Sequence, residues 1–242
     1  MDGAEQGNDQ YATIAAAYDG LDQLPLRRLA EVPTLLAALG PVSGLDVLDL
    51  ACGTGFYSRL LLANGARHVT GVDISAAMLD IARARSAPTD PIRYLQRDLT
   101  EPIDLGQFDI VIASFLLNYA ATRDHLSAMS SNIARHLRPG GRFAGNLTNS
   151  DYDPEHPHDN WYGLAISWTH PADGDELAFQ LHSTTTITAT CYFWSNDTYR
   201  AALYEAGLDG IQFHAWTPDQ TGIDTLGTQF WQPWTTNPTL MV

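Results

Sequence analysis

Apolar and polar positions follow a repeating rhythm over the first 150 residues of the chain. Short apolar runs of strand length alternate with longer segments in which apolar residues recur at helical spacing. The predicted strands are Asp46–Leu50, His68–Val72, Ile92–Leu95, Phe108–Phe115 and Arg142–Leu147. Alternation of this kind predicts an α/β protein with a mostly parallel sheet that is covered by helices on both faces.

The predicted helices occupy the intervals between these strands. One begins after the Gly-rich turn that ends at Gly55, a second is capped by Ser75, and a third covers roughly Arg123–Leu137. Two further helices, over Tyr11–Tyr18 and from Pro25 to Gly40, precede the first strand. We expect these two to form a helical lid.

The pattern changes after Asn149. The segment Leu177–Tyr192 is rich in Thr and aromatic residues and predicts one or two long strands. A helix is expected to start at Asn196 or Thr198 and to stop at Gly207, and a late strand is expected over Ile211–Trp216. We therefore predict one domain in four parts. These are an N-terminal helical lid (1–42), a nucleotide-binding core (43–150), inserted cap strands (151–195), and a C-terminal helix with the last strands of the sheet (196–242).

Charge narrows the classes of function. The 242 residues contain 13 basic side chains, all Arg, against 28 acidic ones, and the net charge is −15. From Asp151 onward Arg200 is the single basic residue. Nucleic-acid binding requires a basic surface, so it is excluded, and anionic membranes are disfavoured for the same reason. The absence of Lys excludes Schiff-base and P-loop chemistry.

Other sequence features concern compartment and assembly. No apolar run approaches the length that crosses a bilayer, and the two Cys residues are too few for a disulfide framework. We expect a cytoplasmic protein that is a monomer or homodimer and acts on a small molecule.

A Gly-rich turn follows the first predicted strand, at Asp49–Gly55 with the sequence Asp-Leu-Ala-Cys-Gly-Thr-Gly. Glycines there permit a tight turn and close approach of a ligand to the backbone. Asp73 ends the second strand, where a carboxylate can accept two ribose hydroxyls, and Asp98 ends the third, near an adenine amino group. Ser58 occupies the position of the third Gly of a dinucleotide fingerprint. A nucleoside without a diphosphate fits this pattern better than a dinucleotide.

These motifs resemble those of class I S-adenosylmethionine-dependent methyltransferases. The resemblance rests on the Gly-rich turn, Gly71–Ser75, Phe108–Val111 and Leu137–Gly141. More narrowly, the chain is similar to the toxoflavin-type small-molecule methyltransferases. That match rests on Tyr11-x-x-Ile14-Ala15-x-x-Tyr18-Asp19, Leu24–Arg27, Gly55–Arg59, Tyr192-x-Trp194-Ser195 and Gly227-x-x-Phe230-Trp231. The resemblance implies a Rossmann-like seven-stranded sheet, S-adenosyl-L-methionine as cofactor and S-adenosyl-L-homocysteine as product.

The resemblance also implies roles for individual residues. Backbone of the Gly-rich turn would meet the methionine part of the cofactor, Asp73 the ribose, and residues near the ends of the second and third strands the adenine. Tyr11, Tyr18 and Tyr119 would cover the sulfonium, and Arg27 is a candidate for the cofactor carboxylate. The remaining implied cofactor contacts are Ala51, Gly53, Gly55, Ile74, Met78, Asp98, Leu99, Ser114 and Phe115.

Candidates on the acceptor side come from the region after Ser114. His182, on an inserted strand, is the first candidate for a general base, with Tyr18 and Tyr119 beside the reacting group. Residues that could orient the acceptor are Asn146, Trp161, Tyr162 and Trp194. All six Trp residues lie after Ser150. We expect three or four of them to be core and one to three to line an aromatic pocket. No metal site is predicted.

The predicted reaction is transfer of a methyl group to N or C of a small aromatic or heterocyclic metabolite, in specialised metabolism. It would proceed by in-line displacement without metal. Three alternatives remain open. They are O-methylation of a small molecule, cyclisation of the cofactor itself with release of methylthioadenosine, and cofactor binding without catalysis. The nearly Arg-free region after Ser150 favours a neutral or cationic acceptor over a phosphorylated one.

Overall fold

The computed structural model describes residues 22–153, 155, 162–166, 171–182, 186–238 and 240–242. Its centre is a parallel sheet of five strands in the order β3-β2-β1-β4-β5. The strands are β1 (Asp46–Leu50), β2 (His68–Asp73), β3 (Ile92–Gln96), β4 (Phe108–Ala113) and β5 (Leu137–Ala144). The predicted Rossmann-like fold is confirmed, but the main sheet of the described residues has five strands rather than seven.

Helices connect these strands where the sequence predicted them. They are α3 (Phe56–Ala63), α4 (Ala76–Arg85) and α5 (Arg123–Arg135). The Ser75 hydroxyl accepts from the Met78 backbone N–H at 3.3 Å and caps α4, as predicted. Thr122 caps α5 in the same way through the His125 N–H. Each cap satisfies a backbone donor that the first helical turn leaves unpaired, so these two helices start at sharply defined residues.

The region before β1 contains a π-helical turn, η2 (Arg27–Glu31), that continues into α2 (Val32–Leu39). This matches the helix predicted between Pro25 and Gly40. Gly40 ends α2 with φ +66° and donates its N–H to Leu36 O at 3.0 Å. The other helix predicted for the lid, over 11–18, lies outside the described residues.

The chain after β5 builds separate, smaller sheets. The strands β7 (Leu164–Ile166), β8 (Glu176–His182) and β9 (Thr186–Tyr192) form an antiparallel sheet of their own, so the predicted long segment is two strands. The short strands β6 (Leu147–Thr148) and β10 (Leu240–Met241) pair antiparallel. A short 3-10 helix, η3 (Leu117–Tyr119), follows β4.

The predicted late strand over 211–216 is wrong. Only Ala215 makes a bridge, to Met241, and His214 exchanges both backbone hydrogen bonds with Val242. The partner segment is the run that also pairs with β6 through Leu240 and Met241.

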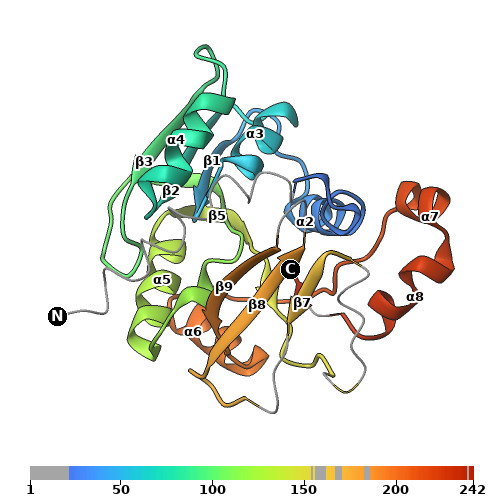
Figure 1. The fold of residues 1–242 in the computed structure, drawn as a ribbon. Coiled ribbons are helices and arrows are strands. Elements are labelled where there is room, and N and C mark those ends of the chain that lie inside the picture. The colour runs from blue at the N-terminus through green and yellow to red at the C-terminus, as the bar shows by residue number, and fades with distance from the viewer. Residues whose placement is uncertain (1–21, 154, 156–161, 167–170, 183–185, 239) are drawn as a thin grey trace.

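The C-terminal region adds three helices: α6 (Asn196–Glu205), α7 (Gln220–Leu226) and α8 (Thr228–Thr236). The first was predicted, and the other two were not. Figure 1 shows α7 and α8 on the α2 side of the molecule, away from β3 and α4. No helix in the described part of the chain is both long and apolar enough to cross a membrane.

Candidate cofactor site

Two residues with a strained backbone lie at the carboxyl ends of the parallel strands. Ala51 and Phe115, with φ of +58° and +60°, are the non-glycine residues with positive φ among those described. They follow β1 and β4, which are neighbours in the sheet. The chain leaves β1 toward β2 on one side and later returns to β4 on the other, which makes this pair the topological switch point where α/β sheets bind ligands. Left-handed non-glycine residues cost free energy and gather at functional sites, so the strain supports a site here.

The Gly-rich turn adopts the conformation that its glycines were predicted to allow. Gly53 and Gly55 have φ of +52° and +76°. A Cβ on Gly53 would meet no atom of the described residues within 4 Å, so these residues leave this side of the turn open to a ligand. A Cβ on Gly55 would lie 3.0 Å from Ala82 Cβ and would also clash with the Tyr94 hydroxyl. Gly53 therefore provides an open approach, whereas Gly55 is required for packing against α4 and β3.

Asp73 joins the end of β2 to this turn. Its carboxylate accepts from Gly53 N and from Ser75 N, both at 2.8 Å, and it is buried. Burial raises the pKa of Asp73, and the backbone N–H groups oppose that shift. The carboxylate thus holds the Gly-rich turn against β2, in the place predicted for ribose binding.

The surface beside Asp73 suits a flat apolar ring. Ile74 is 37% exposed and is one of two large exposed apolar side chains in the described chain. Met78 and Leu99, which follow β2 and β3 in the sequence, are both buried. Asp98 is half-buried, and its Oδ1 accepts from Thr100 N at 2.8 Å and Thr100 Oγ1 at 2.7 Å. The residues predicted to contact adenine thus come just after β2 and β3, which are neighbours in the sheet.

Asp49 lies beneath the turn, and its hydrogen bond explains Ser58. The Ser58 hydroxyl donates to Asp49 Oδ2 at 2.6 Å, whereas Asp49 Oδ1 has no hydrogen-bond partner among the described residues. Burial, with the nearby Asp73 charge, raises the pKa of Asp49 to about 7. A glycine at 58 would remove the donor of this bond, so the serine belongs to a turn built differently from that of dinucleotide sites.

The residues predicted at the methionine end are arranged around β4 and α3. The Arg27 guanidinium pairs with Asp22 Oδ1 at 3.0 Å and Glu31 Oε2 at 3.2 Å, and lies 5.2 Å from the Phe56 ring centroid. Phe56 is the first residue of α3, so Arg27 lies beside the Gly-rich turn. Ser114 and Phe115 follow β4, and Tyr119 is half-buried in η3. Tyr11 and Tyr18 lie outside the described residues.

Several residues predicted to contact the acceptor are inside the protein. Asn146 is fully buried, with Nδ2 2.7 Å from Ser114 Oγ and Oδ1 3.0 Å from Trp216 Nε1. Trp194 is buried and donates its indole N–H to Ala120 O at 2.9 Å. The Tyr162 hydroxyl donates to Phe230 O at 2.6 Å. In this structure these three groups bond to the protein and orient its own segments.

His182 and Trp161 differ from that set. His182 ends β8, and its Nδ1 lies 3.1 Å from Thr186 Oγ1 across the hairpin. It does not contact the turn or the ends of β1 and β4 through any bond that the structure shows. Trp161 lies outside the described residues.

Aromatic side chains form a continuous cluster that reaches the site. We call it the aromatic cluster; its members are Phe115, Tyr162, Trp216, Phe230, Trp231 and Trp234. Trp216 stacks on Trp234 at 5.7 Å and meets the Phe115 ring edge-on at 6.0 Å. The four described Trp residues are all buried. This agrees with the expectation that three or four are core, and it connects α8 to the strained residue after β4.

Sequence reasoning missed Glu31 and Tyr57, two buried polar residues next to this edge. The Tyr57 hydroxyl donates to Glu31 Oε1, and the Asn146 amide donates to the same oxygen at 3.2 Å. The sequence offered one signal for Glu31: it is the single acidic residue of the helix predicted from Pro25 to Gly40.

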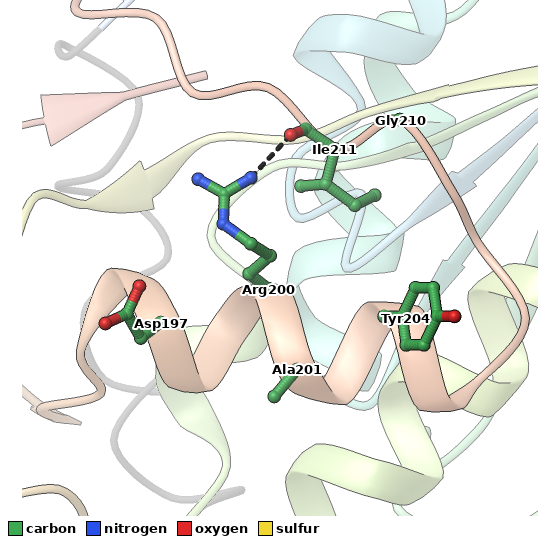
Figure 2. A pocket seen from close by; sticks show the side chains of 6 residues that line it. All are labelled: Asp197, Arg200, Ala201, Tyr204, Gly210 and Ile211. Carbon is green, nitrogen blue, oxygen red and sulfur yellow. Dashed lines mark hydrogen bonds between the residues drawn. The ribbon is translucent and has the colours of Figure 1, made fainter.

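A separate hollow lies on the outer face of α6 (Figure 2). Arg200, Ala201, Tyr204 and Ile211 line it together with Asp197 and Gly210, and Arg200 donates to Ile211 O at 2.6 Å. The Arg200 guanidinium also lies 4.7 Å from the Phe213 ring. None of the predicted site residues lines this hollow.

Comparison with known proteins agrees with the geometry. Residues 47–141 match a family described as "Methyltransferase domain". The chain is 42% identical over 146 residues to a demethylmenaquinone methyltransferase of Clavibacter sepedonicus, which covers 57% of this chain and 56% of that protein. It is 38% identical over 135 residues to a malonyl-[acyl-carrier protein] O-methyltransferase of Pectobacterium atrosepticum, over 55% of this chain and 49% of that one. The chain thus spans about half the length of these curated relatives.

A solved structure extends the likeness beyond the core. An S-adenosylmethionine-dependent methyltransferase from Mesorhizobium loti superposes with a TM-score of 0.65 at 24% identity, over 92% of this chain and 97% of that one. At this identity the likeness shows the fold. Residues 47–141 are therefore similar to a methyltransferase domain, and the chain shares the fold of the S-adenosylmethionine-dependent methyltransferase from Mesorhizobium loti. Both findings agree with the broader resemblance, to class I S-adenosylmethionine-dependent methyltransferases, that the motifs indicated.

Proposed function

We propose that the protein is a methyltransferase that uses S-adenosyl-L-methionine, releases S-adenosyl-L-homocysteine and methylates a small molecule. The observation that carries the proposal is the set of groups at the carboxyl ends of β1, β2 and β4. There an open glycine turn, the buried Asp73 carboxylate and the exposed Ile74 side chain lie together. They fit what a nucleoside with an amino-acid tail requires: a carboxylate that accepts from hydroxyls, an apolar face and close approach to the backbone.

When bound, the cofactor supplies an electrophilic methyl group, and the protein supplies alignment and exclusion of water. Asp73 is proposed to accept from the ribose hydroxyls, with Ile74, Met78, Asp98 and Leu99 around the adenine. The turn at Ala51, Gly53 and Gly55 and the β4 end at Ser114 and Phe115 would hold the methionine part. Arg27 is proposed to face its carboxylate, with Tyr11, Tyr18 and Tyr119 over the sulfonium.

The acceptor is proposed to be a small aromatic or heterocyclic metabolite of specialised metabolism, methylated on N or C without a metal. The aromatic cluster supports this, because Phe115 connects it to the β4 end. The names of the two curated relatives refer to different acceptors, so they do not select one. His182 stays the proposed base, with Trp161, Tyr162, Trp194 and Asn146 as proposed acceptor-side residues. A cytoplasmic monomer or homodimer completes the proposal.

Substitution of Asp73 tests the cofactor site. Asp73→Asn keeps the size of the side chain and one acceptor oxygen but removes the charge and one acceptor. We expect S-adenosylhomocysteine to bind at least about tenfold more weakly in calorimetry, because one charge-assisted hydrogen bond contributes roughly 1.5–3 kcal/mol.

The matched control is Asp80→Asn, the same change at a side chain that is 76% exposed on α4. It should bind with wild-type affinity. Equal affinities of the Asp73 variant and the wild type would contradict the ribose assignment, and a loss in both variants would point to a general charge effect.

A further inference from the structure

A carboxylate is buried within the protein, close to the proposed site. Glu31, the last residue of η2, is 2% exposed. Burying a charge is costly unless donors surround it, and even a well-paired buried charge adds little net stability. The position of such a group therefore calls for a reason other than folding free energy.

Three donors from separate segments converge on Glu31. Arg27 Nε donates to Oε2 at 3.2 Å, whereas the Tyr57 hydroxyl and the Asn146 amide both donate to Oε1, the latter at 3.2 Å. Arg27 belongs to the same helical turn, Tyr57 to α3, and Asn146 to the segment after β5. Glu31 thus connects η2 to α3, the helix that follows the Gly-rich turn, and to the segment after β5.

Asn146 transmits this connection to the strained end of β4. Its Nδ2 donates to Ser114 Oγ at 2.7 Å, and its backbone carbonyl accepts from Phe115 N at 2.8 Å. Its Oδ1 is occupied by the Trp216 indole N–H. Because both ends of the amide are used, Asn146 has one orientation, and its Nδ2 faces Glu31 and Ser114 together.

We propose that Glu31 is a positioning residue for the amino-acid end of the cofactor. It holds Arg27, the proposed partner of the cofactor carboxylate, on one side. Through Asn146 it holds Ser114 and Phe115, the proposed partners of the cofactor amino group, on the other. This inference rests on the proposed function. In it, one buried carboxylate fixes the relative positions of two groups, one that meets the negative charge of the ligand and one that meets its positive charge.

The test compares two ligands that differ in the amino-acid tail. S-Adenosylhomocysteine carries the tail, and methylthioadenosine shares the nucleoside and thioether but lacks it. In Glu31→Gln the shape is kept, but an amide N–H now faces a donor, so the pairing with Arg27 or Asn146 is broken. We expect the Kd of S-adenosylhomocysteine to rise about tenfold, the size of one lost charged hydrogen bond, and that of methylthioadenosine to change less than about twofold.

Asp46→Asn is the matched control, since it makes the same carboxylate-to-amide change at the opposite end of β1. Asp46 pairs there with Arg67 at 2.5 Å and Arg138 at 3.3 Å. This variant should lose stability without discriminating between the ligands. The ratio of the two dissociation constants is the readout that a merely structural Glu31 would leave unchanged.

Each outcome bears on a different claim. Equal weakening of both ligands by Glu31→Gln, or no change for either, would overturn the positioning role. If wild-type protein binds neither ligand, the proposed function itself fails. If Glu31→Gln does not fold, Tyr57→Phe removes one donor to Glu31 and leaves two; it should show the same selective loss at smaller amplitude, and equal effects on both ligands would again overturn the role.

Discussion

The parallel-sheet core and the region after β5 are held together in different ways. In the core, several features proposed to face the cofactor follow a strand within a few residues: the turn after β1, Asp73 at the end of β2 and Phe115 after β4. After β5, the aromatic cluster joins Tyr162 to Trp216 and Trp234 from distant segments. The difference shows that the residues proposed to meet the nucleoside lie close to strand ends in the sequence, whereas the region proposed to hold the acceptor depends on long-range packing.

Charge separates the same two regions. Twelve of the 13 Arg residues precede Asp151, and several pair with acids at the amino-terminal edge of the sheet, such as Arg67 with Asp46 and Arg138 with Asp109. After Ser150 the 12 acidic residues have Arg200 as the single basic residue. Arg200 binds a backbone carbonyl of its own region. The second region therefore carries little positive charge of its own.

The largest expected effect concerns the aromatic cluster. Trp234 is fully buried, stacks on Trp216 and donates its indole N–H to Trp216 O at 2.9 Å. Trp234→Ala should lower the free energy of unfolding by about 3–5 kcal/mol, the usual cost of truncating a buried aromatic side chain. Urea unfolding measures it.

Tyr204→Ala is the control, because Tyr204 is 70% exposed and exposed positions change stability by less than about 0.5 kcal/mol. A Trp234 variant as stable as the wild type would mean that the tryptophan serves a ligand and not the core, which would break the comparison between the regions.

The next prediction tests whether Gly55 is needed for the close packing of the Gly-rich turn. Gly55→Ala forces a left-handed alanine, which costs about 1–2 kcal/mol, and adds the contact with Ala82. We expect a lower melting temperature and S-adenosylhomocysteine affinity reduced by about tenfold or more, since a shifted turn loses at least one backbone contact.

Gly44→Ala separates the two causes. Gly44 also has positive φ, +74°, but its Cβ would meet no atom within 4 Å. It should show the strain cost alone, with normal ligand affinity. Equal binding losses in both variants would refute a specific role for Gly55.

A smaller effect distinguishes the two ends of β1 by their response to pH. The pKa of Asp49 is raised to about 7 by burial, whereas Arg67 lowers the pKa of Asp46. Because the folded state binds a proton at Asp49 more tightly than the unfolded state does, Asp49 should lower stability as pH rises from about 4 to 7. Asp46 acts in the opposite sense, since its folded pKa lies below the unfolded value, and its contribution is lost only in acid.

Asp49→Asn should therefore flatten the decline in stability between pH 5 and 7, by about 1 kcal/mol or more relative to wild type. Urea midpoints at several pH values measure it. Identical pH profiles for wild type and variant would contradict the raised pKa, and Asp46→Asn should leave the profile unchanged over that interval.

The core was predictable because its signals are short-range. The Ser75 cap, the positive-φ glycines at 53 and 55 and the strand-end carboxylate at 73 follow from residues within one strand, turn and helix. Glu31 and Asn146 are 115 residues apart in sequence, and their contact depends on the packing of η2 against the end of β4. The strand predicted over 211–216 failed for a related reason, because its alternating pattern does not reveal which segment it would pair with.

The most direct test of the proposed function is product analysis after turnover with methyl-labelled S-adenosylmethionine and a library of small aromatic and heterocyclic acceptors. Mass spectrometry follows both the label and the nucleoside product. We predict label on an acceptor together with equimolar S-adenosylhomocysteine, lost in Asp73→Asn and retained in Asp80→Asn. Formation of methylthioadenosine from cofactor alone would contradict methyl transfer and would establish a cofactor-cyclising enzyme on the same fold.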